Sequence, residues 1–199
     1  MSPNINVKEI QDAIRKRYAE VSRSAEGKFA YPIGKAVAET LGYDSLDIVN
    51  APKELLDSFC GVGNPFSLGQ ISPGEAVLDI GCGAGFDILV SSRLVGLTGR
   101  VCGIDFTPEM VACAQSNLRR AGVSNVEVRL ASSEVIPYDD STFDVVISNG
   151  VLNLSPYKEK SFQEIFRVLR TDGRFQFADI VLNEDLPPEV ADSADAWSQ

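Results

Sequence analysis

The sequence predicts an α/β fold built on a mostly parallel sheet, and three observations carry that prediction. Short apolar runs recur along the chain, and each is bounded by turn residues, as buried parallel strands are. These runs alternate with stretches of helical length and period. The first run, 76–80, leads into three alternate glycines, Gly81, Gly83 and Gly85, and a helical pattern follows them. This strand–turn–helix unit is where open α/β sheets bind ligands.

Five strands are expected, at 76–80, 99–105, 126–130, 143–149 and 174–182. A helix is expected directly after the glycine turn. A second begins at Thr107-Pro108, where the threonine hydroxyl is the expected cap, and ends near 121. A third follows Ser155-Pro156 and ends near 170. The turn residues 171–173 then lead into the fifth strand, which is expected to form an open edge of the sheet.

Residues 1–70 are expected to form a helical segment packed on a core of residues 71–199. A helix over 1–20 aligns its apolar side chains on one face, including Ile14 and Tyr18. Shorter helices are expected at 35–41 and 53–59. Two interpretations of the first helix stay open: a lid that touches a ligand through Tyr18 or Arg17, or an ordinary solvated helix, which is the commoner case.

Composition indicates a soluble enzyme of one domain. The formal net charge of −10 argues against binding to nucleic acid or to an anionic membrane surface. Neither a membrane-spanning apolar run nor a signal peptide is expected. The four cysteines show no metal-ligand spacing, so no metal site is predicted, and a reduced, cytoplasmic protein is expected; these are Cys60, Cys82, Cys102 and Cys113.

The glycine spacing narrows the ligand class. A dinucleotide turn is G-x-G-x-x-G, whereas this chain has G-x-G-x-G, with Phe86 where the third glycine would fall. Asp79, two positions before Gly81, would repel a pyrophosphate but suits a positively charged amino or sulfonium group. Asp105 ends the second strand, about 20 residues after the glycine turn, where a carboxylate can accept both hydroxyls of a ribose.

Three segments together resemble the class I S-adenosylmethionine-dependent methyltransferases, and most closely the arsenite methyltransferase group. They are residues 79–87 (DIGCGAGFD), 105–110 (DFTPEM) and 147–156 (ISNGVLNLSP). The resemblance implies a Rossmann-like, doubly wound core, and the final antiparallel strands are expected to be missing, because too little sequence follows the fifth strand. It also implies S-adenosylmethionine as cofactor, with S-adenosylhomocysteine as product.

The resemblance further implies which residues hold the cofactor. Asp79 and the glycine turn would bind its methionine end, Asp105 its ribose and Phe106 its adenine, while Asn149 would lie at the rim of the methyl site as a candidate catalytic residue. The complete expected cofactor-binding set is Asp79, Gly81, Cys82, Gly83, Gly85, Asp105, Phe106, Met110, Ser132, Ser133 and Asn149.

The acceptor is expected to be a small molecule, with arsenite or another soft nucleophile as the candidate. Cys60 approximately matches a metalloid-binding cysteine of the arsenite group, although Val62 interrupts the usual C-G-N-P motif. The alternative is that Cys60 is an inert buried thiol. Gly150 stands where the group usually has a second cysteine. The chain contains no histidine, the usual general base, which favours a nucleophile that needs none.

Two other functions stay open at this point. The chain could be an S-adenosylmethionine-binding module, or a truncated fragment, without turnover. A nicotinamide oxidoreductase is disfavoured by the glycine spacing and by Asp79. A homodimer through the exposed edge of the sheet is a further expectation.

Overall fold

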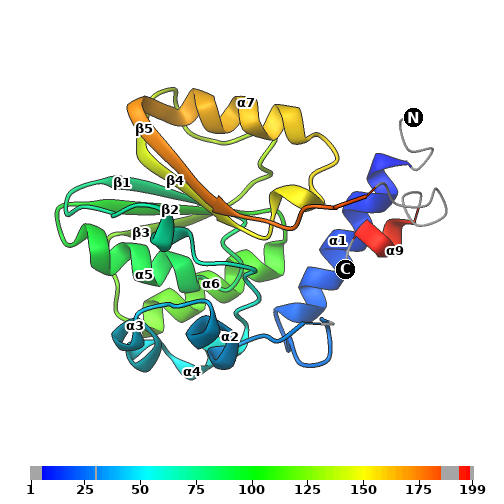
Figure 1. Cartoon of the computed structure of the whole chain (residues 1–199), viewed down its shortest axis with the longest axis horizontal. Helices are drawn as coiled ribbons and strands as arrows, with labels where there is room; N and C mark the ends of the chain where they lie inside the picture. The colour runs from blue at the N-terminus through cyan, green and yellow to red at the C-terminus, as the bar shows by residue number, and fades with distance from the viewer. Residues whose placement is uncertain (1–5, 30, 185–192, 198–199) are drawn as a thin grey trace.

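The structure is a computed structural model that describes residues 6–29, 31–184 and 193–197. Within these ranges, five strands form one all-parallel sheet in the order β3-β2-β1-β4-β5 (Figure 1). The strands are β1 (Ala76–Ile80), β2 (Arg100–Asp105), β3 (Val126–Leu130), β4 (Phe143–Asn149) and β5 (Leu169–Ala178). The predicted α/β class is confirmed. Strand order reverses between β1 and β4, which makes the carboxyl ends of β1, β2 and β4 the expected ligand crevice.

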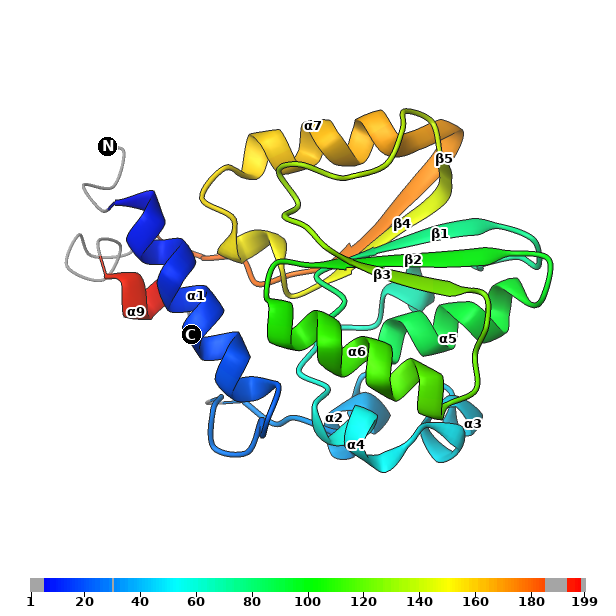
Figure 2. The same cartoon turned by 180° about the vertical axis from the view of Figure 1, so that it is seen from behind.

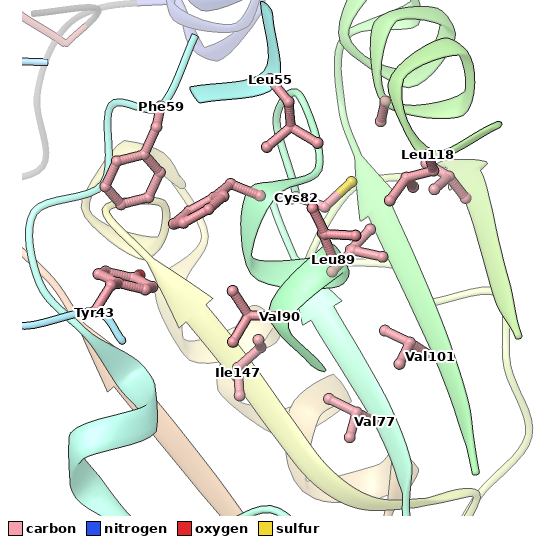
Figure 3. Packing of buried hydrophobic residues seen from close by; sticks show 14 of the residues in the cluster. Tyr43, Leu55, Phe59, Val77, Cys82, Leu89, Val90, Val101, Leu118 and Ile147 are labelled. Atoms are coloured by element: carbon pink, nitrogen blue, oxygen red, sulfur yellow. The ribbon is translucent and has the colours of Figure 1, made fainter. Parts of the chain in front are cut away.

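Helices cover both faces of the sheet. α5 (Phe86–Val95) and α6 (Pro108–Arg120) lie on one face and α7 (Lys158–Val168) on the other (Figure 2). All five residues of β1 are buried, because alternate side chains enter opposite apolar layers. Val77 packs with Leu89 and Val101 on the α5 side (Figure 3). Leu78 joins the cluster on the α7 side.

Short helices precede the sheet: α1 (Val7–Val21), α2 (Lys35–Thr40), α3 (Ser45–Asn50), α4 (Lys53–Asp57) and the 3₁₀ turn η1 (Pro65–Leu68). α1 begins after Asn6, whose side chain accepts from the backbone N–H of Lys8; positions 1–5 of the expected helix lie outside the described residues. α3 was not predicted. It is six residues long, and a capping bond of 2.7 Å from Leu46 N–H to Asp44 starts it.

The end of the sheet differs from the prediction. α7 stops at Val168 and β5 starts at Leu169, earlier than position 174, because the expected turn lies inside β5 as a bulge. Leu169 pairs with Phe143, and the next pair is Arg174 with Val145, so the intervening residues loop out and Asp172 takes φ 63°. β5 ends at Ala178, short of 182. The following Asp179 instead accepts a 3.1 Å bond from Asn153 N–H in the turn η2 (Leu152–Leu154).

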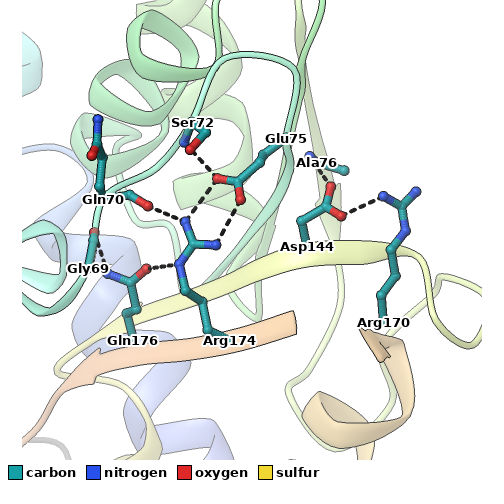
Figure 4. Close-up of polar contacts among 9 residues, drawn as sticks. All are labelled: Gly69, Gln70, Ser72, Glu75, Ala76, Asp144, Arg170, Arg174 and Gln176. Carbon is teal, nitrogen blue, oxygen red and sulfur yellow. Dashed lines mark hydrogen bonds and ion pairs between the residues drawn. The ribbon is translucent and has the colours of Figure 1, made fainter. Parts of the chain in front are cut away.

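Polar side chains fix β5 to the segment that leads into β1 (Figure 4). The Arg174 guanidinium donates to both carboxylate oxygens of Glu75, at 2.8 and 2.9 Å. Gln176 is buried and donates to the carbonyl of Gly69 at 2.9 Å. Asp144 of β4 accepts from Ala76 N–H at 2.8 Å. These bonds hold the entry to β1 in place, while β5 remains at the end of the sheet.

The last described residues form α9 (Ala194–Trp197), which lies against α1 (Figures 1 and 2). The Pro187-Pro188 pair and most of the acidic tail fall outside the described residues. No helix in the described ranges is long and apolar enough to cross a membrane.

Candidate functional site

A pocket opens at the carboxyl ends of β1, β2 and β4, where strand order reverses. Its empty volume, counting the open mouth, is about 900 Å³. Gln11, Ile14 and Tyr18 of α1 line one side of it. Of the residues expected from the sequence, nine line this pocket: Cys60, Gly81, Gly83, Asp105, Phe106, Met110, Ser132, Ser133 and Asn149.

Three expected residues lie beside the pocket rather than in its lining. Asp79 is buried next to it. The Cys82 side chain points into the apolar cluster on the α5 side, so only its backbone can take part in binding (Figure 3). Gly85 takes φ 98° at the start of α5, and a Cβ there would contact Leu118 at 3.4 Å. Cys82 and Gly85 therefore shape the turn and seat α5 against α6.

The glycine turn leaves room for a ligand. Gly83 takes φ 51°, and a Cβ added to it would meet no atom within 4 Å, so its backbone faces open space in the pocket wall. Gly81 has the opposite surroundings: a Cβ there would lie 2.3 Å from Val151. The turn is thus open at one glycine and tightly packed at the other.

Asp105 connects β2 to both the glycine turn and α6. Its carboxylate accepts from Gly83 N–H at 2.9 Å and from Thr107 N–H at 2.8 Å. Thr107 occupies the N-cap position of α6, but its side chain makes no capping bond, so the predicted hydroxyl cap is wrong. Burial raises the pKa of Asp105 to about 6, although these hydrogen bonds oppose the rise.

Three buried carboxyl groups surround the turn, and they fit a cationic ligand. Burial raises the pKa of Asp79, and the neighbouring charges of Asp87 and Asp105 raise it further. One carboxylate oxygen of Asp79 has no hydrogen-bond partner in the described structure. An ammonium or sulfonium group would stabilise these charges, and the open face of Gly83 leaves space for it. The residues present therefore fit S-adenosylmethionine, whose sulfonium and amino groups are both positive.

Asn149 occupies the expected place at the end of β4, but its side chain is fully engaged. Its oxygen accepts from Val62 N–H at 2.8 Å and Gly63 N–H at 3.1 Å. Its nitrogen lies 2.9 Å from the Gly63 carbonyl and 3.1 Å from both Tyr43 Oη and Asp87 Oδ2. Sequence reasoning missed Tyr43, since nothing local marks it; Asp87 closes the glycine motif and was not assigned a role.

Glu134, a buried acid that directly follows Ser132 and Ser133 in the sequence, was also missed as a site residue. The Ser132 hydroxyl donates to its carboxylate, and Ser155 donates to it at 2.6 Å. The Ser133 hydroxyl lies 2.8 Å from that of Ser161 in α7. The loop after β3 is therefore fastened to the start of α7 across one end of the pocket.

Cys60 faces the pocket as a protonated thiol. Burial raises its pKa to about 12, and the nearby charges of Asp105 and Asp87 act in the same direction. Gly150 packs against Val62, where an added Cβ would approach a valine methyl to 3.3 Å. Cys60 is the sole cysteine among the described residues that line the pocket.

The α1 side of the pocket contacts the expected adenine region. Arg15 lies 4.0 Å above the centre of the Phe106 ring, a cation–π arrangement. Tyr18 lines the pocket, and burial raises the pKa of its hydroxyl well above its ordinary value. Arg17, the other residue considered for a lid contact, is not in the pocket lining and lies over Phe29 instead.

Curated proteins that this chain matches include arsenite methyltransferases. The chain is 36% identical over 196 residues to an arsenite methyltransferase of Halobacterium salinarum. The alignment covers 92% of this chain and 50% of that protein. The chain is 29% identical over 195 residues to the human arsenite methyltransferase, with coverages of 94% and 50%. The chain thus spans about half the length of these curated relatives.

Solved structures agree with this. An arsenic(III) S-adenosylmethionine methyltransferase from Chlamydomonas reinhardtii matches with a TM-score of 0.64 and 34% identity over 80% of this chain and 53% of that one. A SAM-dependent methyltransferase from Aquifex aeolicus matches with a TM-score of 0.55 and 30% identity, covering 63% of this chain and 70% of that one. A family model described as a methyltransferase domain matches residues 71–199. With the parallel sheet and the acidic glycine-turn pocket, these matches show that the chain belongs to the class I S-adenosylmethionine-dependent methyltransferase family.

Proposed function

We propose that this chain is an S-adenosylmethionine-dependent methyltransferase that moves a methyl group to a small-molecule acceptor. The observation that carries the proposal is the pocket at the carboxyl ends of β1, β2 and β4. There Asp79 and Asp105 flank a glycine turn with open space in front of Gly83. Family membership supports the same activity and argues against the nicotinamide alternative.

In this proposal the residues around the glycine turn bind the cofactor. Asp79 and the backbone of Gly81 and Gly83 receive the positively charged methionine end. Each oxygen of Asp105 holds one backbone amide, so each keeps a lone pair for a ribose hydroxyl. The adenine lies among Phe106, Met110, Ser132 and Ser133. The cofactor supplies an already activated methyl group, and the protein orients the reactants and excludes water.

We propose that the segment 1–70 caps the core and that α1 is its lid. Gln11, Ile14 and Tyr18 line the pocket from α1, and Arg15 rests on Phe106. Deletion of α1 is expected to weaken cofactor binding while the sheet still folds, as measured by calorimetry and circular dichroism. Unchanged cofactor affinity in the deletion variant would contradict the lid.

We propose a soft nucleophile as the acceptor, with arsenite, the substrate in the relatives' names, as the first to test and Cys60 as its contact. Arsenic has a soft lone pair that needs no general base, which is consistent with a chain that contains no histidine. Cys60 lines the same pocket as Asn149 and Gly150. Because the pocket offers this one thiol, we expect arsenite to react best when it carries small-molecule thiols.

The first experiment is calorimetry with S-adenosylmethionine and S-adenosylhomocysteine on the wild type and on Asp105→Ala. The substitution is expected to weaken binding by about 1.5–3 kcal/mol, the scale of hydrogen bonds to a charged group. Asp172→Asn is the matched control, because it removes a charge on an exposed bulge where asparagine tolerates positive φ. Absence of binding by the wild type would refute the cofactor assignment.

A methyl-transfer assay with labelled cofactor then separates an enzyme from a binding module. Transfer to arsenite in the presence of a small thiol supports the proposed acceptor. Binding without transfer to arsenite, thiols or other soft acceptors would favour the alternative, a cofactor-binding module without turnover.

We further propose a cytoplasmic homodimer that pairs through β5. β5 ends the sheet and exposes Phe177 next to Phe162, while all four cysteines are free thiols, as in a reducing compartment. Light scattering is expected to give a dimer mass that Phe177→Ser lowers. A monomeric wild type would contradict the pairing, and recovery of the protein outside the cytoplasmic fraction would contradict the location.

A further inference from the structure

We propose that Tyr43, Asp87 and Asn149 form a positioning clamp that holds the loop 60–63 against the carboxyl end of β4. Asn149 then shapes the acceptor side, the part of the pocket lined by Cys60 and Gly150, without touching the reacting atoms. The clamp is defined by these three residues. This inference rests on the proposed methyltransferase function, and it changes the expected role of Asn149 from catalytic to positioning.

The first argument is the hydrogen-bond capacity of Asn149. A carboxamide has two N–H donors and an oxygen with two lone pairs. The oxygen already accepts from Val62 N–H at 2.8 Å and from Gly63 N–H at 3.1 Å. The nitrogen donates to the Gly63 carbonyl at 2.9 Å and to Asp87 at 3.1 Å. No donor or lone pair of the Asn149 side chain is left for a substrate. Asn149 therefore affects the pocket through the space that it fills and not through a hydrogen bond to a ligand.

The second argument is that the other clamp residues are anchored outside the pocket. The Tyr43 hydroxyl donates to Asp87 Oδ1 at 2.7 Å, and both side chains are buried. The Tyr43 ring packs among three aromatic rings, with centroid distances of 5.3, 5.9 and 5.1 Å to Phe59, Phe66 and Phe86. Figure 3 shows Tyr43 and Phe59 in this cluster. Neither Tyr43 nor Asp87 lines the pocket. A change at Tyr43 can therefore reach the acceptor side through Asn149, through the Gly63 carbonyl that lies 3.2 Å from the Tyr43 hydroxyl, and through the charge of Asp87 near Cys60.

The third argument is the fit between the loop and the clamp. A Cβ at Gly61 would lie 2.4 Å from the Asn149 nitrogen and 2.6 Å from the Phe59 ring. The loop backbone can approach Asn149 this closely only because position 61 is glycine. The neighbouring Cys60 faces the pocket. The clamp thus fixes the loop backbone at Val62 and Gly63, directly after the segment that carries Cys60.

The test uses Tyr43→Phe, which removes one hydroxyl outside the pocket and keeps the ring. We expect S-adenosylhomocysteine affinity within about twofold of wild type, because the cofactor residues on β1 and β2 are untouched. We expect kcat to fall at least about tenfold as the loop loosens. Tyr157→Phe is the matched control, since Tyr157 is exposed and lies outside the pocket lining, and it should behave as wild type.

A second measurement does not depend on turnover. The rate of Cys60 alkylation by iodoacetamide, mapped by mass spectrometry, should rise several-fold in Tyr43→Phe, with Cys113 as the internal reference. A wild-type Cys60 rate in a folded Tyr43→Phe protein would overturn the clamp, and so would an unchanged kcat. If the wild type binds no cofactor, the proposed function fails, yet the alkylation rates still decide the clamp.

The conservative variant Asp87→Asn provides a further check. Its amide oxygen can still accept from Tyr43, but its NH₂ group then faces the NH₂ group of Asn149, so the bond between Asn149 and position 87 is lost and Cys60 alkylation should rise above wild type here too. Thermal melts accompany all variants. A folded Asp87→Asn protein with a wild-type rate of Cys60 alkylation would show that Asp87 does not hold Asn149 in the clamp.

Discussion

The buried acids around the glycine turn should make the ligand-free protein less stable as pH rises from 5 to 7. Burial raises the pKa of Asp87 and of Asp105 from the ordinary 3.8 to about 6. In the folded protein each therefore keeps its proton at pH values where the unfolded chain has already released it. Stability falls wherever the folded state binds more protons than the unfolded state, here from about pH 4 up to the folded pKa and beyond.

The magnitude follows from linkage. A pKa raised from 3.8 to about 6 corresponds to about 3 kcal/mol lost per group once both states are ionised, since one pKa unit is about 1.4 kcal/mol. Between pH 5 and pH 7 the loss is about 1 kcal/mol per group. Glu75 has a lowered pKa because Arg174 donates to it. The stability that Glu75 contributes is therefore lost only at lower pH and does not mask the decrease expected between pH 5 and pH 7.

The assay is urea unfolding, followed by circular dichroism, at pH 5, 6 and 7. Asp105→Asn should remove about 1 kcal/mol of the decrease, because its amide does not titrate; Asp172→Asn, on an exposed bulge, is the control for removing one carboxylate. Saturating S-adenosylmethionine should reduce the decrease in the wild type, since its positive charge favours the ionised acids. Equal pH dependence in the wild type and in Asp105→Asn would refute this reasoning.

Three further outcomes are expected. Gly61→Ala should lower the free energy of unfolding by about 1–3 kcal/mol, because its Cβ would lie 2.4 Å from the Asn149 amide; an unchanged urea midpoint would contradict the close packing. Arg174→Gln should cost about 1–2 kcal/mol, because Glu75 loses two charged hydrogen bonds at a partly exposed site; high salt should weaken the effect, and a neutral result would show that water replaces the bonds. Cys60→Ser should lower the rate of arsenite methylation and leave cofactor affinity unchanged in calorimetry; full activity would exclude Cys60 as the acceptor contact.

Local pattern was enough to predict the sheet and many of the residues that line the pocket. Continuous apolar runs identify strands that are buried on both faces, and the alternate glycines mark the turn that follows the first of them. Residues at the ends of parallel strands meet at one edge of a sheet. For this reason Gly83, Asp105 and Asn149, far apart in sequence, could be expected in one pocket before the structure was known.

The tertiary structure alone decided which of these side chains are available to a ligand. Asn149 ends its strand as expected, yet its amide is occupied by a loop nearly ninety positions earlier in the chain, at Val62 and Gly63. The bond from Tyr43 to Asp87 joins residues 44 positions apart and leaves no local signal. The local pattern of apolar and turn residues predicts whether a segment forms a strand, a helix or a turn. Hydrogen bonds between distant segments depend on how those segments pack, which the local pattern does not contain. The sequence therefore determined where the site lies, and the packing of the loop 60–63 decided which residues hold it in shape.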